Sequence, residues 1–205
     1  MKRRWKLLLV AGVAALLVAS VSGVALAAGP QWKASGEAGN ASAQTRAVQD
    51  GSCIDTAAVT PLSEYEEETL LFMLEEEKLA RDVYTALYAK WEVAQFSNIA
   101  ASESRHMASI EKLVDRYDLV ELDTLDTPGV FANDDLQALY DDLVARGTRS
   151  LEEAFQVGVD IEELDIDDLE DLIGQTSHAD ITRVMQNLLR GSQNHLRAFT
   201  ASLNN

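Results

Sequence analysis

Cysteine is almost missing from this chain of 205 residues, since Cys53 is the only one. A single cysteine cannot form a disulfide within the chain, so the fold has no internal disulfide framework. Cys53 also lies well beyond the apolar amino-terminal run, which argues against a lipid-anchored amino terminus. The thiol could pair with a second chain, but a buried or merely tolerated cysteine is the simpler interpretation.

Positive charge is also scarce. The chain has 17 Lys and Arg residues against 34 Asp and Glu residues, which gives a formal net charge of −17. Such a chain repels nucleic acid and anionic membrane surfaces, and its field attracts cations. A solvated acidic surface that keeps the protein soluble is the plainest reading of this charge. Nothing in the sequence indicates a haem, nucleotide or nucleic-acid site.

The long apolar run of the sequence stands at the amino terminus. A basic start (MKRRWK) precedes LLLVAGVAALLVASVSGV, and Ala25-Leu26-Ala27 offers a cleavage site between small residues. This pattern predicts a secretory signal peptide over residues 1–27, cleaved before Ala28, and therefore a secreted or periplasmic protein. Loss of its four Lys and Arg residues takes the net charge from −17 to −21. An uncleaved membrane anchor stays the alternative, because the run is long enough to span a bilayer.

The rest of the chain divides into two parts by composition. Residues 28–60 are small, polar and aperiodic, which is typical of a flexible spacer. Residues 61–205 show long helical periodicities, no strand-like alternation and no internal repeat. We therefore expect one all-α domain with a sizeable core, and no membrane contact once the signal is removed.

Start and stop signals predict four long helices and one short helix. The long helices are expected over residues 63–91 (opened by Ser63-x-x-Glu66), 97–117, 150–173 (opened by Ser150 and ended by Gly174) and 177–203 (opened by Ser177-x-x-Asp180). The short helix, over 133–146 and closed by Gly147, lies within the long link between the second and third long helices. Short turns make the first pair and the last pair antiparallel, and the long link can cross a four-helix bundle once.

The apolar stripe of each long helix is interrupted near its middle by polar residues. These are Glu77 on the first helix, Glu103 and His106 on the second, Glu162 and Asp165 on the third, and Ser192 and His195 on the fourth. Burying unpaired carboxylates and imidazoles costs several kcal/mol each, so a stable core needs a reason for them. Residues three apart on a helix face the same way, and carboxylate oxygen with imidazole nitrogen suits iron, manganese or zinc. The joint pattern predicts an enclosed site for two divalent metal ions.

Several assignments within this pattern stay open. Glu76 could be the inward residue in place of Glu77, and Glu162 lies in an acidic tract where an exposed face is the usual outcome. Tyr84 could hydrogen-bond a ligand carboxylate, serve as a redox group, or simply pack in the core. His178 lies off the stripe and is given no role.

Four segments carry a resemblance to known proteins: EEEKLARDVY, NIAASESRHM, IEELDI and LLRGSQNHLRAF. Together they resemble the ferritin-like superfamily, in which helices carry Glu, Glu-x-x-His, Glu and Glu-x-x-His around two metals. They are most similar to an uncharacterised family of ferritin-like domains found in exported prokaryotic proteins. The resemblance covers residues 61 to about 203.

The resemblance implies a fold, a ligand set and an activity. The fold is a ferritin-like four-helix bundle with one long crossover that carries a short extra helix. The metal ligands would be Glu77, Glu103, His106, Glu162, Asp165 and His195, with Glu103 or Glu162 as the bridge and one histidine on each metal. Two iron ions, or iron with manganese, would react with oxygen or peroxide as an oxidoreductase.

The chain departs from the superfamily pattern at Ser192, where a glutamate is expected. Asp165, three residues after Glu162, is the candidate to supply the missing oxygen from another helix. A single metal ion or an empty site is therefore an open alternative, and so is a non-catalytic metal-binding or structural bundle. Iron storage is a weaker alternative, and a homodimer is one possible assembly.

Overall fold

The structure, a computed structural model, describes residues 60–120 and 122–204. The described residues form five α-helices and no strand: α1 (Glu64–Trp91), α2 (Ala94–Arg116), α3 (Asp134–Gly147), α4 (Leu151–Gln175) and α5 (Ala179–Leu203). The predicted all-α class is confirmed. The predicted signal peptide, nearly all of the spacer and Cys53 lie outside the described residues.

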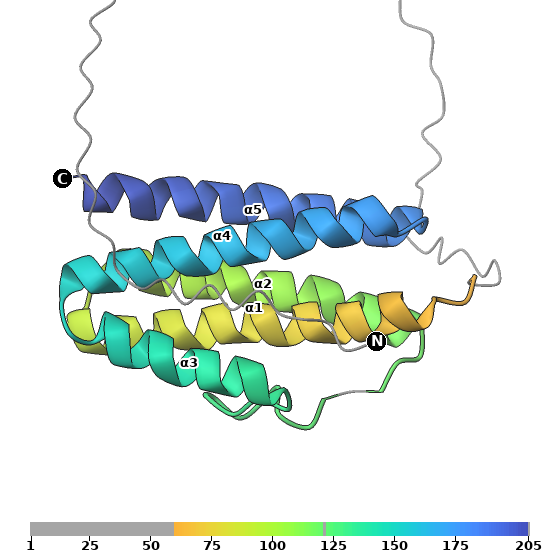
Figure 1. Cartoon of the computed structure of the whole chain (residues 1–205), viewed down its shortest axis with the longest axis horizontal. Helices are drawn as coiled ribbons and strands as arrows, with labels where there is room; N and C mark the ends of the chain where they lie inside the picture. Colours follow the sequence, from red (N-terminus) through yellow and green to blue (C-terminus); the bar gives the residue numbers. More distant parts are fainter. Residues whose placement is uncertain (1–59, 121, 205) are drawn as a thin grey trace, which may run out of the picture. The chain divides into compact units, whose positions relative to one another are not determined.

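The helices pair as two hairpins. The closest packing is between α1 and α2 and between α4 and α5, with lighter contacts of α1 with α4 and of α2 with α5. Figure 1 shows the four long helices side by side, with α2 and α4 running in the same direction and α1 and α5 in the opposite one. The short α3 packs on α1 and α4. No described helix is long and apolar enough to cross a membrane.

The capping signals explain three of the helix starts. Ser63 accepts a hydrogen bond from the Glu66 amide and Glu66 accepts one from the Ser63 amide at 2.9 Å, so the predicted capping box opens α1. Asn133 and Ser150 cap α3 and α4 in the same manner. These caps satisfy amide groups that a helix start otherwise leaves unpaired.

Three predicted boundaries were wrong. The second helix begins at Ala94, three residues before the predicted start, because Val93 takes the extended conformation that precedes a helix. Gly174 does not end α4, which continues through Gln175. His178, not Ser177, precedes the first residue of α5, and no side chain caps that helix.

The core consists of two apolar clusters, one towards each end of the long helices. One contains residues such as Leu87, Phe96, Val157 and Phe199, and the other contains residues such as Leu70, Ile110, Leu172 and Met185. On α1, α2, α4 and α5 the stretch between the two clusters carries the polar residues that interrupt each stripe. The fold therefore holds one polar layer at mid-height between two apolar ones.

Candidate metal centre

Glu103 lies at the centre of the polar layer. Its side chain extends from α2, is 2% exposed, and turns its two oxygens towards two different imidazoles. Oε2 lies 2.7 Å from Nδ1 of His106, and Oε1 lies 2.9 Å from Nδ1 of His195. The predicted Glu-x-x-His pair on α2 thus faces inward and meets the histidine of α5.

A first group of three ligands gathers around His106. Nδ1 of His106 is 3.1 Å from Oε2 of Glu77 on α1, in addition to its contact with Glu103. One ligand atom from each of Glu77, Glu103 and His106 lies within 4.8 Å of the others. The first triad therefore joins α1 and α2, the two helices of one hairpin.

A second triad gathers around His195. Nδ1 of His195 is 3.5 Å from Oε2 of Glu162 on α4, and Glu103, Glu162 and His195 again offer three atoms within 4.8 Å. Glu103 belongs to both triads, so a single carboxylate connects them. The two histidine rings face each other with centroids 5.7 Å apart.

Tyr84 connects the second triad to the aromatic core. Its buried hydroxyl donates a hydrogen bond of 2.6 Å to Oε1 of Glu162 and lies 3.4 Å from the Gly158 carbonyl. Its ring packs on Phe199 with centroids 5.2 Å apart. Tyr84 therefore both hydrogen-bonds a candidate ligand carboxylate and packs in the core, which are two of the three interpretations from sequence.

Asp165 and Ser192 are buried in the same layer but belong to neither triad. Oδ1 of Asp165 has no hydrogen-bond partner, while the Ser192 hydroxyl donates to the Leu188 carbonyl at 3.1 Å. The same hydroxyl also lies beside the Asp165 carboxyl group, where it counteracts part of the rise in pKa that burial causes. The structure thus brings five of the six predicted ligands into two triads and places the sixth beside them.

Glu76 and Glu77 are both buried, so neither of the two alternatives from sequence holds alone. Glu77 contacts His106, whereas Glu76 lies among the carboxylates of Asp165 and Asp168 and has no hydrogen-bond partner of good geometry. The sequence argument assumed that one of the two faces water. It failed because Glu76 also faces the interior, beside Asp165 and Asp168 of α4.

The crossover segment that leads to α3 covers a second side of α1. Glu75 accepts hydrogen bonds from the amides of Ala132 and Asn133 at 2.5 and 3.1 Å. Lys78, which is 0% exposed, forms an ion pair of 2.7 Å with Asp82. We call Glu75, Lys78 and Asp82 the crossover clamp.

Three further contacts complete the crossover clamp. Lys78 donates to the Val130 carbonyl at 3.0 Å and lies 4.0 Å from the ring centre of Phe131, and Asp82 accepts from the Gly129 amide at 2.9 Å. Sequence reasoning missed this role, because a run of charges usually marks a solvated face. The four-residue spacing of Lys78 and Asp82 was the one available signal of a pair.

Burial and mutual repulsion make protonated carboxyl groups favourable in the layer. Burial raises the pKa of Glu77 well above its usual value, and the carboxylates of Asp165 and Glu103 raise it further. Burial raises the pKa of Glu162 to about 8 and that of Asp165 to about 7. Without a cation, the layer therefore holds protons at neutral pH.

The shared carboxylate and the imidazoles behave in the opposite way. Burial alone would raise the pKa of Glu103, but contacts with His106 and His195 outweigh it and hold that pKa at about 2. Burial alone would lower the pKa of His195, but contacts with Glu103 and Glu162 raise it to about 9. Glu103 is thus the carboxylate that stays ionised, between two imidazoles whose pKa values its contacts raise.

The donor set fits divalent metal ions. Buried oxygens of Glu77, Glu103 and Asp165, and Nδ1 of His195, have no hydrogen-bond partner of good geometry although other ligand atoms lie close. Two cations would satisfy these atoms and take the place of the positive charge now carried by protons. Carboxylate oxygens with imidazole nitrogens are suited to iron, manganese or zinc.

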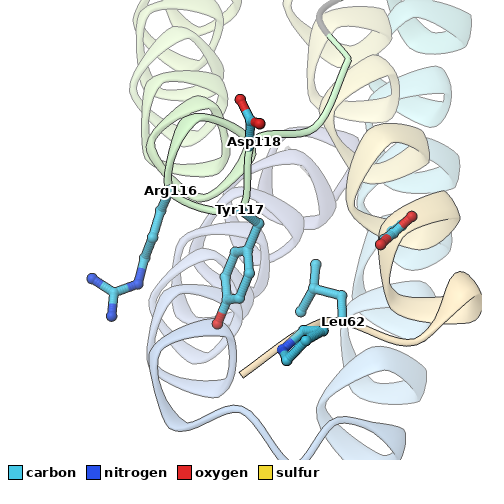
Figure 2. A pocket seen from close by; sticks show the side chains of 6 residues that line it. Leu62, Arg116, Tyr117 and Asp118 are labelled. Carbon is cyan, nitrogen blue, oxygen red and sulfur yellow. The ribbon is translucent and has the colours of Figure 1, made fainter. Parts of the chain in front are cut away.

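A surface pocket lies elsewhere, at the carboxyl end of α2. Pro61, Leu62, Glu67, Arg116, Tyr117 and Asp118 line it. Figure 2 shows Tyr117 beside Leu62, with the Arg116 side chain directed away from both. The Tyr117 hydroxyl donates to Asp180 at 2.9 Å and lies 3.2 Å from Nδ1 of His178, so it ties α2 to the start of α5. No residue of either triad lines this pocket, and we assign it no chemistry.

Known proteins resemble the helical part of the chain. The model of a family described as an uncharacterized protein domain (DUF2202) matches residues 66–205. The uncharacterized protein MJ0754 of Methanocaldococcus jannaschii is 48% identical over 145 residues, which cover 71% of this chain and 78% of that protein. A crystal structure of hypothetical protein MJ0754 from Methanococcus jannaschii matches with a TM-score of 0.70 and 47% identity, covering 72% of this chain and 84% of that one. On the extent of these matches, the chain belongs to the DUF2202 family of uncharacterized protein domains.

Proposed function

We propose that the chain is a ferritin-like four-helix-bundle domain that binds two divalent metal ions in its polar layer. Glu77, Glu103 and His106 would hold one ion, and Glu103, Glu162 and His195 the other. The observation that carries the proposal is the position of Glu103, whose oxygens lie 2.7 and 2.9 Å from imidazole nitrogens of two different helices. A purely structural salt bridge needs only one such partner.

Four helices supply the ligands, in the same order of residue types as in the ferritin-like pattern. Of the two bridging candidates, this geometry favours Glu103, because it alone belongs to both triads. Asp165 would serve as a terminal ligand or as a neighbour that adjusts the charge of the site. Iron is the metal we propose first and manganese second.

Bound iron or manganese would supply one-electron chemistry with oxygen or peroxide. The residues of the chain would provide the setting for it. Tyr84 orients Glu162 through its hydrogen bond, and apolar clusters on both sides of the layer limit the entry of water. We therefore propose an oxidoreductase as the activity of the loaded protein.

A non-catalytic metal-binding domain is the second candidate, and a specific observation favours it. Ser192 stands where the sixth ligand is expected, and its hydroxyl is occupied by the Leu188 carbonyl. With Asp165 outside both triads, the site is one carboxylate short of the ferritin-like set. Such a site could hold metal without reacting with oxygen.

Metal content separates these candidates from an empty structural domain. The protein is purified from its native host without added metal and analysed for metal per chain. We expect two equivalents of iron, or iron with manganese, in the wild type, and fewer than one in Glu103→Gln. Glu163→Gln is the matched control, because Glu163 is the exposed neighbour of Glu162, and it should retain both equivalents. A wild type without metal, which also binds none when Fe(II) or Mn²⁺ is supplied, would overturn the proposal.

Reaction with oxygen separates the two metal-binding candidates. Fe(II) is added to the apo protein without air, oxygen is then admitted, and Fe(III) formation is followed by absorbance. Oxidation that is faster than that of free Fe(II), and that is lost in Glu103→Gln but retained in Glu163→Gln, supports the oxidoreductase. Binding without faster oxidation supports the non-catalytic domain.

A further inference from the structure

Gly191 is a glycine in the interior of a long helix, where its presence needs a reason. It lies in the middle of α5, and it is not among the residues with positive φ. A helix-interior glycine costs about 1 kcal/mol relative to alanine, because it loses more backbone freedom on folding. The backbone conformation therefore does not require glycine here, and the reason must lie in what surrounds the residue.

The surroundings of Gly191 are the edge of the His106 ring. A Cβ atom at position 191 would lie 2.6 Å from Nε2 and 2.7 Å from Cε1 of His106, closer than side-chain carbons approach other atoms. The imidazole of α2 thus lies directly against the backbone of α5. An alanine could fit only if the ring or the helix moved.

The other nitrogen of the same ring contacts the two glutamates of the first triad. Nδ1 of His106 lies 2.7 Å from Glu103 and 3.1 Å from Glu77, and the ring is rigid, so a shift at Nε2 carries Nδ1 with it. A movement away from α5 large enough to admit a Cβ atom would be of the order of 1 Å, the difference between 2.6 Å and an ordinary contact. Ligand geometry does not tolerate a displacement of that size.

We propose that Gly191 is a positioning residue for the first metal ion, which it serves by leaving the space that His106 needs. The inference rests on the proposed function, since it assumes that His106 is a ligand. It also gives α5 a role in both triads. His195 is a ligand in the second triad, and the absence of a side chain at Gly191 makes room for the ligand His106 of the first. Loss of this space should weaken binding of the first ion and leave binding in the second triad unchanged.

Manganese titration of the apo protein tests this, with free Mn²⁺ measured by electron paramagnetic resonance. The variant is Gly191→Ala, and the matched control is Gly174→Ala, since a Cβ at Gly174 of α4 would meet nothing within 4 Å. We expect two ions in the wild type and in Gly174→Ala. Gly191→Ala should bind one ion as before and the other about 10- to 100-fold more weakly, the usual effect of disturbing a residue that orients a ligand.

A double-mutant cycle shows whether the effect passes through His106. In a His106→Ala background the ring is gone, so Gly191→Ala should cause no further loss of manganese affinity. An equal loss in both backgrounds would overturn the inference, because position 191 would then act by another route. Two ions of unchanged affinity in Gly191→Ala would overturn it too, while the proposed function would stand.

The remaining outcomes are also decisive. A wild type that binds no manganese and no iron refutes the proposed function, and this inference with it. If Gly191→Ala does not fold but the double variant with His106→Ala does, judged by circular dichroism, the clash with the ring is established and the inference is supported. If neither variant folds, position 191 is needed for helix packing as such, and the inference is wrong.

Discussion

At the scale of single residues, the polar layer is organised by contacts that differ in kind. Glu103 makes two contacts with imidazoles, whereas Glu162 has one imidazole and one phenol as partners. A carboxylate that accepts a hydrogen bond from a buried phenol is fixed in orientation even without metal. The roles of these two glutamates can therefore be separated by substitution.

Replacement of Tyr84 by Phe should destabilise the apo protein at pH 7 by about 0.5–1.5 kcal/mol, the usual net contribution of a hydrogen bond between uncharged groups, because Glu162 holds a proton at this pH. The change removes the 2.6 Å bond to Glu162 and keeps the ring that packs on Phe199. Urea unfolding measures the free energy. Tyr88→Phe on the same helix is the control, because Tyr88 is 42% exposed, and it should change little. Equal effects of the two substitutions would mean that the bond to Glu162 contributes nothing.

The pH dependence of the apo protein follows from groups that hold protons more tightly when folded, among them Asp165, Glu162 and His195. Glu162 has a folded pKa of about 8 against an ordinary 4.5, and His195 has about 9 against 6.5. Between these values the folded state binds more protons than the unfolded state, so the free energy of unfolding falls as pH rises. We expect the melting temperature in the presence of a chelator to fall from pH 6 to pH 9.

Bound metal should oppose this fall of the melting temperature with rising pH. Bound cations replace the protons of the layer, so metal affinity rises with pH, and the difference in melting temperature between loaded and apo protein should widen. Glu162→Gln removes one of the titrating groups and should flatten the apo profile. An apo protein whose stability increases between pH 6 and 9 would contradict this account.

At the scale of helices, α1 differs from the other three long helices because its middle is buried on two sides. One side carries Glu77 and Tyr84 into the polar layer, and the other carries the crossover clamp. The clamp also holds the segment before α3, whose amides bind Glu75. The two functions therefore share one stretch of helix, from residue 75 to 84.

Lys78→Met should destabilise the fold by about 3–5 kcal/mol, because it leaves Asp82 buried with less compensation for its charge. The substitution also removes the donor to the Val130 carbonyl. Lys90→Met is the control on the same helix, since Lys90 is exposed. Urea unfolding of both variants measures the difference. A loss below about 1 kcal/mol for Lys78→Met would show that the clamp is not needed to hold the crossover.

Sequence patterns predicted the helices and five members of the two triads well, and the reason is the long, regular periodicity. The stripes predicted buried positions for Glu77, Glu103 and Glu162 because each falls where an apolar residue otherwise stands. At the helix ends the local signals were wrong, since α4 continues past Gly174 to Gln175 and His178, not Ser177, precedes α5. The burial of Glu75 was not predictable, because it depends on a crossover segment that is distant in sequence.

At the scale of the whole molecule, the second triad spans the boundary between the two helix hairpins, whereas the first lies within one of them. The α1–α2 hairpin supplies Glu77, Glu103 and His106, and the α4–α5 hairpin supplies Glu162 and His195. Helix contacts between the hairpins are lighter than those within them. A metal ion bound in the second triad would therefore hold the two hairpins together at the contact where helix packing is lightest.

Metal should accordingly stabilise the folded protein by mass action. Addition of Mn²⁺ to apo protein should raise the melting temperature of the wild type, and Glu103→Gln should lose most of that rise because both triads need this residue. Glu77→Gln should retain part of it, since it belongs to the first triad only. Differential scanning calorimetry measures all three. An equal rise in the wild type and in Glu103→Gln would place the bound metal outside the layer.

The amino-terminal prediction belongs to the whole chain as well. If residues 1–27 are a signal peptide and 28–60 a spacer, the exported protein should begin near Ala28, and mild proteolysis should shorten it to near Pro61 without loss of helicity. Mass spectrometry and circular dichroism measure the two effects. An intact amino terminus recovered with the membrane fraction would indicate the uncleaved anchor instead.

The arrangement of one polar layer between two apolar clusters restricts how the length of this protein can vary. The ligands come from four separate helices and must meet at one height, so they depend on the count of residues within each helix. One extra residue between Phe96 and Glu103 would turn the rest of α2 by about 100° and advance it by about 1.5 Å, which removes Glu103 from the layer. An extra residue in the turn at Thr176 would leave every ligand at its height. Relatives that keep the layer should therefore differ in length at their connections and agree in the spacing of their helices.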